Sequence, residues 1–463
     1  MNQRTVDRVI VGLGVLLRLY NLGYGDAWHD EAFTGIVAPL PWAQFWPALW
    51  GDVHPPGWYI ITRPFVLALP HGEAALRLPA CICGVLALLL FYRYCCKHAA
   101  GSTGRAALAL LAVSPFMVYY SQEARMYGAM TLVGVLLLVA LAEDLPAVFA
   151  GAAVAACWLH NLGVVVVAAG VLALLARGWP TARWRRWGAV GLALAAPALI
   201  WTAGQALRVS AGYWIVDKSV GAWLYNALYC PLLGQGMIGA GLSWNAALAA
   251  LGLALPAAAL GVTRRRWDWL ALAFAPGLLM LAVSNLVRPM LLARTLIASA
   301  PALYLLVGDL VGASRRRQIV AGLLLAPLLI SGLLNHYTTS RRGDMSIITD
   351  AIEAEAPAVV IHSQTGGYVV LSYHMPGQNH ALWAGAAAGL SNAISQPTQD
   401  ALNLERYSLD DAPRPAAVVY SDYALISPEE RTNMLADLDA AGAELVAVLA
   451  EDEYQRIDLW MLY

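Results

Sequence analysis

The chain has 463 residues, of which 59% are hydrophobic and 13% are charged, with a formal net charge of −1. This composition excludes an ordinary soluble protein, because water-facing positions interrupt the apolar runs of such a protein every few residues. We expect no nucleic-acid partner.

Long charge-free runs predict that the chain crosses a membrane repeatedly. A helix needs about 20 apolar residues to cross the hydrocarbon core. The run Leu145–Ala176 is too long for one such helix, so we divide it at His160–Asn161. The runs together predict about eleven transmembrane helices, centred near residues 16, 86, 113, 135, 152, 169, 195, 253, 278, 301 and 326.

Basic clusters between these helices predict the orientation, because Lys and Arg are enriched on the cytoplasmic side of membrane proteins. All the clusters share one side if the N-terminus is cytoplasmic: Arg4 and Arg8, Lys97 and Arg105, the arginines of 177–186, Arg264–Arg266 and Arg315–Arg317. The first outer loop, residues 25–75, then lies on the opposite face. We expect a multi-pass protein of a bacterial cytoplasmic (inner) membrane.

The charge balance divides the chain near residue 343. Residues 1–342 contain 25 Lys and Arg against 12 Asp and Glu, whereas residues 343–463 contain 4 Arg against 18 acids. We therefore predict a transmembrane domain over 1–342 and a soluble acidic domain over 343–463. An odd number of spans places the acidic domain on the periplasmic or extracellular side.

The acidic domain has the pattern of a small α/β fold. Short apolar, β-branched segments predict four strands: Ala358–Ser363, Ala416–Ser421, Glu444–Leu449 and Gln455–Leu462. Ser427-Pro428-Glu429-Glu430 predicts a helix start, with Gly442 as the residue that ends the helix. The domain is predicted either to shape access to the membrane part or to bind the acceptor, with a purely structural role as the alternative.

Two groups of polar residues in the first outer loop are candidates for chemistry. Asp30 and Glu31 are adjacent acids just after the first span, and neighbouring helical residues point in different directions. One acid can face a substrate while the other anchors the loop or binds a cation; a solvated acidic loop is the alternative. His54 precedes Pro55-Pro56, which hold it rigidly. An ordinary loop histidine is the alternative there.

Two further groups lie at the outer ends of later spans. Glu123 and Arg125, with Tyr127 after them, occupy an apolar hairpin, where charges are costly and indicate function. A local ion pair is the alternative. Arg288 and Arg294 lie on the predicted outer side, where the positive-inside trend predicts few arginines. The planar guanidinium group of arginine can bind a phosphate through two hydrogen bonds. Snorkelling to lipid headgroups is the alternative. Arg208 and Lys218 are weaker candidates for the same role.

The order and spacing of these groups resemble the GT-C glycosyltransferases, and most closely the bacterial protein-mannosyltransferase-like and aminoarabinose-transferase-like family. The resemblance covers roughly residues 10–310. The matching motifs are Leu17–Leu22, Asp30-Glu31-Ala32, His54-Pro55-Pro56, Arg77-Leu78-Pro79, Ser114-Pro115, Gln122–Tyr127 and Arg294 before Pro301. Two positions depart from the family pattern: Ala80, where Ser is usual, and Thr295, where many relatives carry Tyr.

The resemblance implies an inverting glycosyltransferase that moves a hexose or pentose from a polyprenyl phosphate to an acceptor hydroxyl on the extracytoplasmic face. Asp30 maps onto the family's catalytic aspartate, and Glu31 joins it in the predicted catalytic pair. The predicted substrate-binding residues are His54, Glu123, Arg125, Tyr127, Arg288 and Arg294, with Arg294 first for the phosphate.

The resemblance leaves the cofactor and the acceptor open. Some relatives use a divalent metal, for which Glu31, His54, Glu123 and His160 offer ligands; no nucleotide is expected, because the donor's energy lies in its sugar–phosphate bond. The acceptor is a glycan, a lipid or a protein. A transporter or flippase of a polar glycolipid is the rival interpretation, although transporters place their key charges near the midplane of the bilayer.

Overall fold

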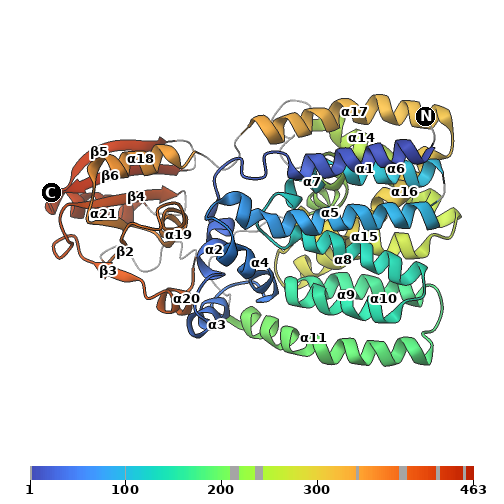
Figure 1. The fold of residues 1–463 in the computed structure, drawn as a ribbon, viewed down its shortest axis with the longest axis horizontal. Coiled ribbons are helices and arrows are strands. Elements are labelled where there is room, and N and C mark those ends of the chain that lie inside the picture. The colour runs from blue at the N-terminus through green and yellow to red at the C-terminus, as the bar shows by residue number, and fades with distance from the viewer. Residues whose placement is uncertain are drawn as a thin grey trace.

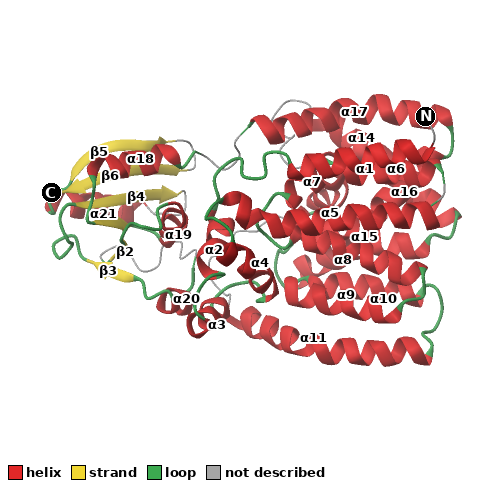
Figure 2. Cartoon of the chain, viewed as in Figure 1, coloured by secondary structure: helices red, strands yellow, loops and turns green. Residues whose placement is uncertain are grey.

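The computed structural model describes residues 3–99, 101–208, 218–234, 243–339, 344–384, 394–423, 428–451 and 455–463. It has a long bundle of helices and, at one end of the bundle, a sheet with its own helices (Figure 1). Short helices from the first outer loop lie between these two parts (Figure 2). The site described below lies at this junction.

The bundle is built from helices that run along its long axis. They are α1 (Gln3–Leu19), α5 (Glu73–His98), α6 (Ser102–Val113), α7 (Pro115–Ser121), α8 (Tyr127–Ala142), α9 (Pro146–Leu159), α10 (Gly163–Leu175), α11 (Ala182–Arg208), α14 (Ser243–Thr263), α15 (Trp267–Leu286), α16 (Ala300–Gly312) and α17 (Arg315–Thr338). Shorter pieces are α12 (Val220–Leu224), the π-helix Tyr225–Tyr229, α13 (Cys230–Leu233) and the 3-10 helix Ala293–Ser299.

Every predicted span centre falls inside one of these helices. Among the described residues, five helical segments are long and apolar enough to cross a membrane, or six if α6 and α7, which are bent by 51° at their junction, form one span. Four shorter apolar helices accompany them. The described helices thus agree with a membrane protein, while the count of eleven crossings stays a prediction.

Close packing inside the bundle depends on small residues, as in other membrane helices. A Cβ atom added at Gly128 of α8 would lie 2.5 Å from the carbonyl oxygen of Ala80 in α5. One added at Gly308 of α16 would lie 2.6 Å from the carbonyl oxygen of Thr103 in α6. These helices therefore approach with their backbones in contact.

The first outer loop folds into three short helices, α2 (His29–Val37), α3 (Trp42–Trp50) and α4 (Gly57–Ala68). Arg63 of α4 fixes their arrangement, because its guanidinium donates to the carbonyl oxygens of Ala38 at 2.7 Å and Leu40 at 2.6 Å. The same guanidinium lies 4.3 Å from the ring centre of Trp42. The loop is therefore a packed part of the structure.

The described C-terminal residues form a six-stranded sheet in the order β3-β2-β1-β4-β6-β5. β1, β2, β3 and β4 pair in parallel, whereas β6 pairs antiparallel with β4 and β5. The strands are β1 (Val359–His362), β2 (His380–Trp383), β3 (Glu405–Tyr407), β4 (Ala416–Tyr423), β5 (Glu444–Glu451) and β6 (Gln455–Leu462). The four predicted strands are confirmed as β1, β4, β5 and β6; the sequence did not predict β2 and β3.

Helices cover both faces of this sheet. Alternate residues of β1 point to opposite faces, so Val360 packs with α18 (Ser346–Glu355) and α19 (Thr365–His374), and Val359 packs with α21 (Pro428–Ala440). α21 begins at the predicted proline, and Gly442 follows it with a φ of 71°. The predicted capping residue Ser427 lies outside the described residues.

The sheet part packs directly on the first outer loop. α19 lies against α2, and α20 (Gln396–Ala401) lies against α3. Val369 and Tyr373 of α19 share one buried cluster with Phe33 and Phe45 of the loop. The Thr398 hydroxyl of α20 donates to the carbonyl oxygen of Ala48 at 2.8 Å. The C-terminal segment therefore helps to hold the loop that carries Asp30.

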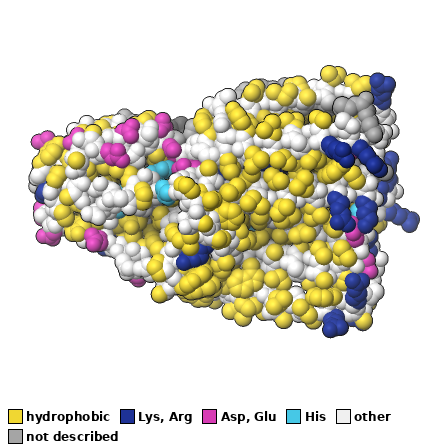
Figure 3. All heavy atoms as spheres, viewed as in Figure 1, with side chains coloured by type: hydrophobic (Ala, Val, Ile, Leu, Met, Phe, Trp, Pro, Cys, Tyr) yellow, Lys and Arg dark blue, Asp and Glu magenta, His cyan; other side chains and the backbone are white. Residues whose placement is uncertain are grey.

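Surface charge is divided between the two ends of the molecule. Figure 3 shows a broad apolar surface on one face of the bundle, with most of the visible Lys and Arg side chains at the end away from the sheet and acidic side chains over the sheet part. The basic clusters that were used to predict the orientation therefore gather at one end, opposite the first outer loop.

Candidate active site at the outer end of the bundle

Asp30 lies in the first turn of α2, with its side chain 25% exposed. Its Oδ2 is 3.8 Å from Nη1 of Arg294, and its Oδ1 is 3.5 Å from Nδ1 of His29. Burial by itself would raise the pKa of Asp30, but Arg125, His29 and Arg294 together bring that pKa well below its usual range. Asp30 is thus a carboxylate that faces two arginines and still reaches solvent.

Arg125 is the centre of the hydrogen-bond network around Asp30. It lies in the turn between α7 and α8 and is 2% exposed. Its Nη1 lies 3.3 Å from each of three oxygens: the Asp30 carbonyl, the Thr34 hydroxyl and the Tyr59 hydroxyl. Its Nη2 lies 2.9 Å from Nδ1 of His54. One guanidinium therefore joins α2, α4 and the His54 loop.

The contact with Arg125 also defines the protonation state of His54. A guanidinium can only donate, so Nδ1 of His54 accepts and the imidazole is neutral. Burial and the charge of Arg125 both lower the pKa of His54, against the opposing effect of Asp52. Oδ2 of Asp52 lies 3.8 Å from that nitrogen and accepts a hydrogen bond of 2.6 Å from the Tyr59 hydroxyl.

A residue from a distant helix secures the backbone of this loop. Gln205 of α11 is buried, and its side-chain amide donates to the carbonyl oxygens of Leu49 at 3.2 Å, Asp52 at 2.6 Å and His54 at 3.0 Å. Asn161 also donates to the carbonyl oxygen of Val53. The segment before Pro55 is thus held from outside the loop.

Glu31 is oriented away from Asp30 and is 0% exposed. Arg77 of α5 donates to both of its carboxylate oxygens, through Nε at 2.9 Å and Nη2 at 3.0 Å. The backbone nitrogen of Ala124 donates to Oε1 at 2.8 Å. Arg77 also donates to the carbonyl oxygens of Tyr24 and Gly25, each at 2.9 Å. Glu31 therefore joins α2 to α5 and to the Arg125 turn.

The remaining predicted residues lie around this network. Tyr127, the first residue of α8, is 2% exposed, and its ring centre is 5.9 Å from Cζ of Arg294. Glu123 is buried in the same turn as Arg125. Arg288 is half-buried in the segment that leads to Arg294. The structure thus brings Asp30, His54, Arg125, Tyr127 and Arg294 together.

Several residues of the network had no role in the sequence-based prediction. Asp52 and Tyr59 lie close to His54 in the sequence, and Arg77 belongs to the Arg77-Leu78-Pro79 motif, so the sequence offered a signal for all three. Gln205 gave a weaker signal, as a polar residue near the end of an apolar helix. Of the two weaker phosphate candidates, the Lys218 side chain is exposed, and that of Arg208 lies outside the described residues.

The proposed metal ligands of the sequence-based prediction do not form a group in the described part of the chain. There, one set of three His, Cys, Asp or Glu side chains brings its ligand atoms within 4.8 Å of one another, and it consists of Asp26, Glu73 and His374. Glu31, His54, Glu123 and His160 are not members of it.

Comparison with known proteins identifies the fold. No protein-family model and no curated protein sequence matches the chain. Two crystal structures of ArnT from Cupriavidus metallidurans, one in the apo state and one bound to undecaprenyl phosphate, match with TM-scores of 0.61 and 0.62 at 13% and 14% identity. They cover 98% and 99% of this chain and 97% and 98% of their own.

A crystal structure of an oligosaccharyltransferase from Archaeoglobus fulgidus also aligns, with a TM-score of 0.49 and 12% identity, over 90% of this chain and 68% of its own. The two ArnT structures establish the architecture: the chain has the GT-C fold, from the first helix through the C-terminal sheet.

Proposed function

We propose that this chain is an integral-membrane inverting glycosyltransferase that moves a sugar from a polyprenyl-phosphate donor to an acceptor hydroxyl. The observation that carries the proposal is the pair Asp30–Arg294, a solvent-reaching carboxylate 3.8 Å from a guanidinium at the outer end of a membrane bundle. The fold shared with ArnT, which binds undecaprenyl phosphate in one of its structures, supports the same donor class.

In the proposed reaction, the acceptor oxygen attacks the anomeric carbon from the face opposite the phosphate. The new carbon–oxygen bond forms as the bond to the phosphate oxygen breaks, and that electron pair leaves with the phosphate. Asp30 accepts the acceptor proton and faces the positive charge that develops on the sugar. Arg294 binds the leaving phosphate, with Arg125 and Arg288 as further cations.

The lowered pKa of Asp30 gives a physical reason why the donor would bind before Asp30 accepts the proton. In the structure, Arg294 and Arg125 hold the proton affinity of Asp30 low, which by itself makes a weak base. A phosphate that binds Arg294 shares the positive charge of that residue, and the proton affinity of Asp30 then rises. Donor binding would thus prepare the base.

The other predicted residues receive supporting roles in this proposal. Glu31 would position α2 through its ion pair with Arg77. Of the two roles predicted for the second acid, anchoring the loop or binding a cation, this is the anchoring role. Glu123 lies in the turn that carries Arg125. His54 lies beside Arg125 and Tyr127 lies beside Arg294, and both would contact the sugar or its phosphate. The acceptor, whether glycan, lipid or protein, would reach Asp30 from the solvent to which its side chain is 25% exposed.

We further propose the predicted topology and domain division. The N-terminus would be cytoplasmic in a bacterial inner membrane, with residues 1–342 as the transmembrane catalytic domain and 343–463 as the extracytoplasmic one. The basic end of the bundle, opposite the first outer loop, supports this orientation (Figure 3). Cysteine labelling of the two ends in intact cells tests it directly.

The experiment that tests the function incubates purified protein in vesicles with a radiolabelled polyprenyl-phosphate sugar and a panel of acceptor lipids, glycans and peptides. Transfer of label to an acceptor by the wild type, together with its loss in Asp30→Asn, is the expected result. Movement of the donor across the vesicle without transfer would identify a transporter instead.

A further inference from the structure

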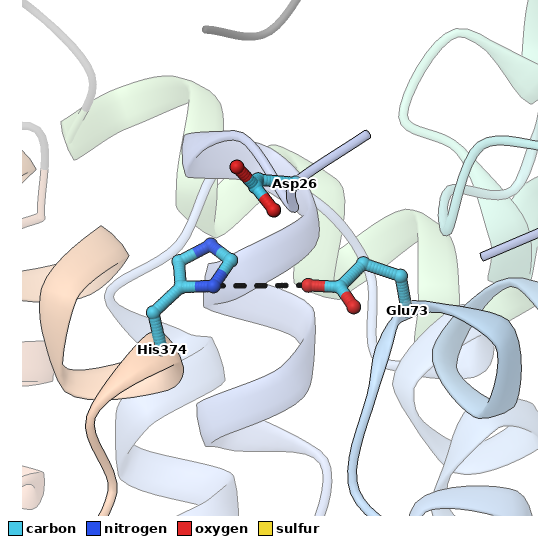
Figure 4. A group of neighbouring side chains, drawn as sticks. All are labelled: Asp26, Glu73 and His374. Carbon is cyan, nitrogen blue, oxygen red and sulfur yellow. Dashed lines mark ion pairs between the residues drawn. The ribbon is translucent and has the colours of Figure 1, made fainter. Parts of the chain in front are cut away.

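A second cluster of polar side chains lies outside the candidate active site, where three distant segments meet. Asp26 follows α1, Glu73 is the first residue of α5 and His374 is the last residue of α19. One ligand atom from each lies within 4.8 Å of the other two, and all three residues are half-buried. Figure 4 shows the imidazole next to both carboxylates, with Nδ1 of His374 3.7 Å from Oε1 of Glu73.

The orientation of His374 is fixed by its second nitrogen. Nε2 lies 3.1 Å from the carbonyl oxygen of Ala27. A carbonyl only accepts, so Nε2 carries a hydrogen and donates it to Ala27, which leaves Nδ1 to face Glu73. Metal-binding histidines usually have this arrangement, with one nitrogen on the metal and the other donating to a carbonyl or carboxylate.

Asp26 is held in a comparable way. Its Oδ2 accepts a hydrogen bond of 2.6 Å from the backbone nitrogen of Met345, at the start of the C-terminal segment. Carboxylates that bind a metal are commonly oriented by hydrogen bonds from groups that do not themselves contact the metal. Two of the three side chains therefore have their directions set by backbone groups, before any cation is considered.

The composition of the cluster favours a shared cation. Two carboxyl groups and an imidazole nitrogen face one another in a half-buried site, where unpaired polar groups are costly. A single divalent cation can contact all three. One imidazole and two carboxylates form a mixed nitrogen and oxygen set that suits Zn²⁺.

We propose that Asp26, Glu73 and His374 bind a divalent transition-metal ion of the Zn²⁺ type, with water completing the coordination. Zn²⁺ binds these ligand atoms at about 2.0–2.2 Å, which places them roughly 3.4 Å apart in a tetrahedron. The atoms must therefore approach one another by about an ångström, a movement that rotation of half-buried side chains allows.

The bound ion would join the C-terminal sheet part to the outer end of the bundle. Asp26 lies four residues before Asp30, on the segment whose backbone Arg77 holds through Tyr24 and Gly25. His374 ends the helix that packs on α2. The ion thus acts as a cross-link that positions α2, separate from the reacting groups.

The test uses the full-length protein in detergent, stripped with a chelator and titrated with ZnCl₂. Elemental analysis after gel filtration is expected to find one zinc per chain in the wild type, and zinc is expected to raise the thermal unfolding temperature. Asp26→Asn, Glu73→Gln and His374→Asn each should weaken zinc binding by at least tenfold and remove the thermal shift.

The matched control is His71→Asn. His71 lies two residues before Glu73 at the same junction, where Nε2 lies 3.0 Å from the Tyr373 carbonyl oxygen, but it is not in the cluster. This variant should bind zinc like the wild type. A wild type without bound zinc or thermal shift overturns the proposal, even if a variant fails to fold, and so does zinc binding that all three substitutions leave unchanged.

Discussion

Glu31 and Arg77 form a doubly hydrogen-bonded ion pair at the base of the first outer loop, with side chains that are 0% and 1% exposed. The pair connects α2, which carries Asp30, to α5. A buried pair of this kind gives little net stability by itself, but removing one partner leaves a charge without compensation. The position of the candidate base Asp30 thus depends on Arg77, which lies 46 positions from Glu31 in the sequence.

Glu31→Gln is expected to lower the free energy of unfolding by about 3–5 kcal/mol, because Arg77 is then buried without its counter-charge. Thermal or denaturant unfolding of the purified protein measures the change. Arg93→Ala is the control on the same helix: Arg93 is 65% exposed and pairs with Glu143 at 3.5 Å, so its loss should cost less than about 1 kcal/mol. Equal losses in the two variants contradict the structural role of Glu31.

Asp30→Asn should reduce the transfer rate by about 10²–10⁴-fold while the protein stays folded, because the amide has the shape of the carboxylate but cannot take a proton. Initial rates with a labelled donor measure the effect. Glu143→Gln, at the opposite end of the bundle, should transfer at the wild-type rate. Wild-type transfer by Asp30→Asn is incompatible with the proposed base.

Arg294→Ala is expected to weaken donor binding and the rate together, since both the ground-state and leaving phosphate use this guanidinium. Arg294→Lys should restore part of the activity, because an ammonium keeps the charge but loses the planar fork. Competition by unlabelled polyprenyl phosphate reports binding independently of turnover. The neighbouring Thr295→Ala serves as the control, since the Thr295 hydroxyl donates to the local Leu292 carbonyl oxygen at 2.7 Å. Unchanged competition in Arg294→Ala would refute the phosphate role.

Acid should destabilise the protein in two stages. Burial and Arg125 lower the pKa of His54 in the fold, so below the unfolded value of about 6.5 the unfolded state binds a proton that the folded state does not, and stability falls with pH. The depressed pKa of Asp30 and that of Asp52 add a second loss below about 4, as the unfolded carboxylates protonate first.

His54→Gln is expected to reduce the loss of stability between pH 6.5 and 5 and to leave the loss below pH 4 in place. Unfolding temperatures over this pH range provide the measurement. His160 faces His54 with ring centres 5.5 Å apart, and its pKa is also lowered by burial, so a part of the first loss should persist in the variant. An unchanged first stage would contradict the neutral state of His54.

Gln205→Ala should slow transfer and destabilise the protein by about 1–3 kcal/mol, because three loop carbonyls lose their shared donor. Rates and unfolding curves of the same preparations separate the two effects. Leu207→Ala lies two residues further along α11, with Leu207 87% exposed, and should change neither. A stable and fully active Gln205→Ala would show that the loop is held by other contacts.

The sequence was sufficient for features that depend on local pattern. Charge-free runs located the helices of the bundle, and the order of Asp30, His54, Arg125 and Arg294 grouped residues that the structure brings together. β2 and β3 were not predicted, because neither contains a β-branched residue, whereas β1, which is as short as β2, begins with Val359-Val360-Ile361. The two ends of α21 could be predicted because a proline marks its start and a glycine follows its end.

Pairings between residues far apart in the chain could not be predicted from the sequence. Neither Glu31 nor Arg77 shows in its own surroundings that the other is its partner. The same holds for Asp26 and His374, which the chain separates by more than half of its length. One sequence supplies the residue types, but the packing of α19 on α2 decides which of them meet.

The contact of Thr398 with Ala48 also has a consequence for biosynthesis. The two residues are 350 positions apart. At about 5–20 residues per second, a ribosome needs roughly 20–70 s to make the intervening chain. During that interval the nascent first outer loop has emerged without the helices that cover α2 and α3. A newly inserted molecule therefore acquires its finished candidate site only near the end of translation, when the whole fold is present.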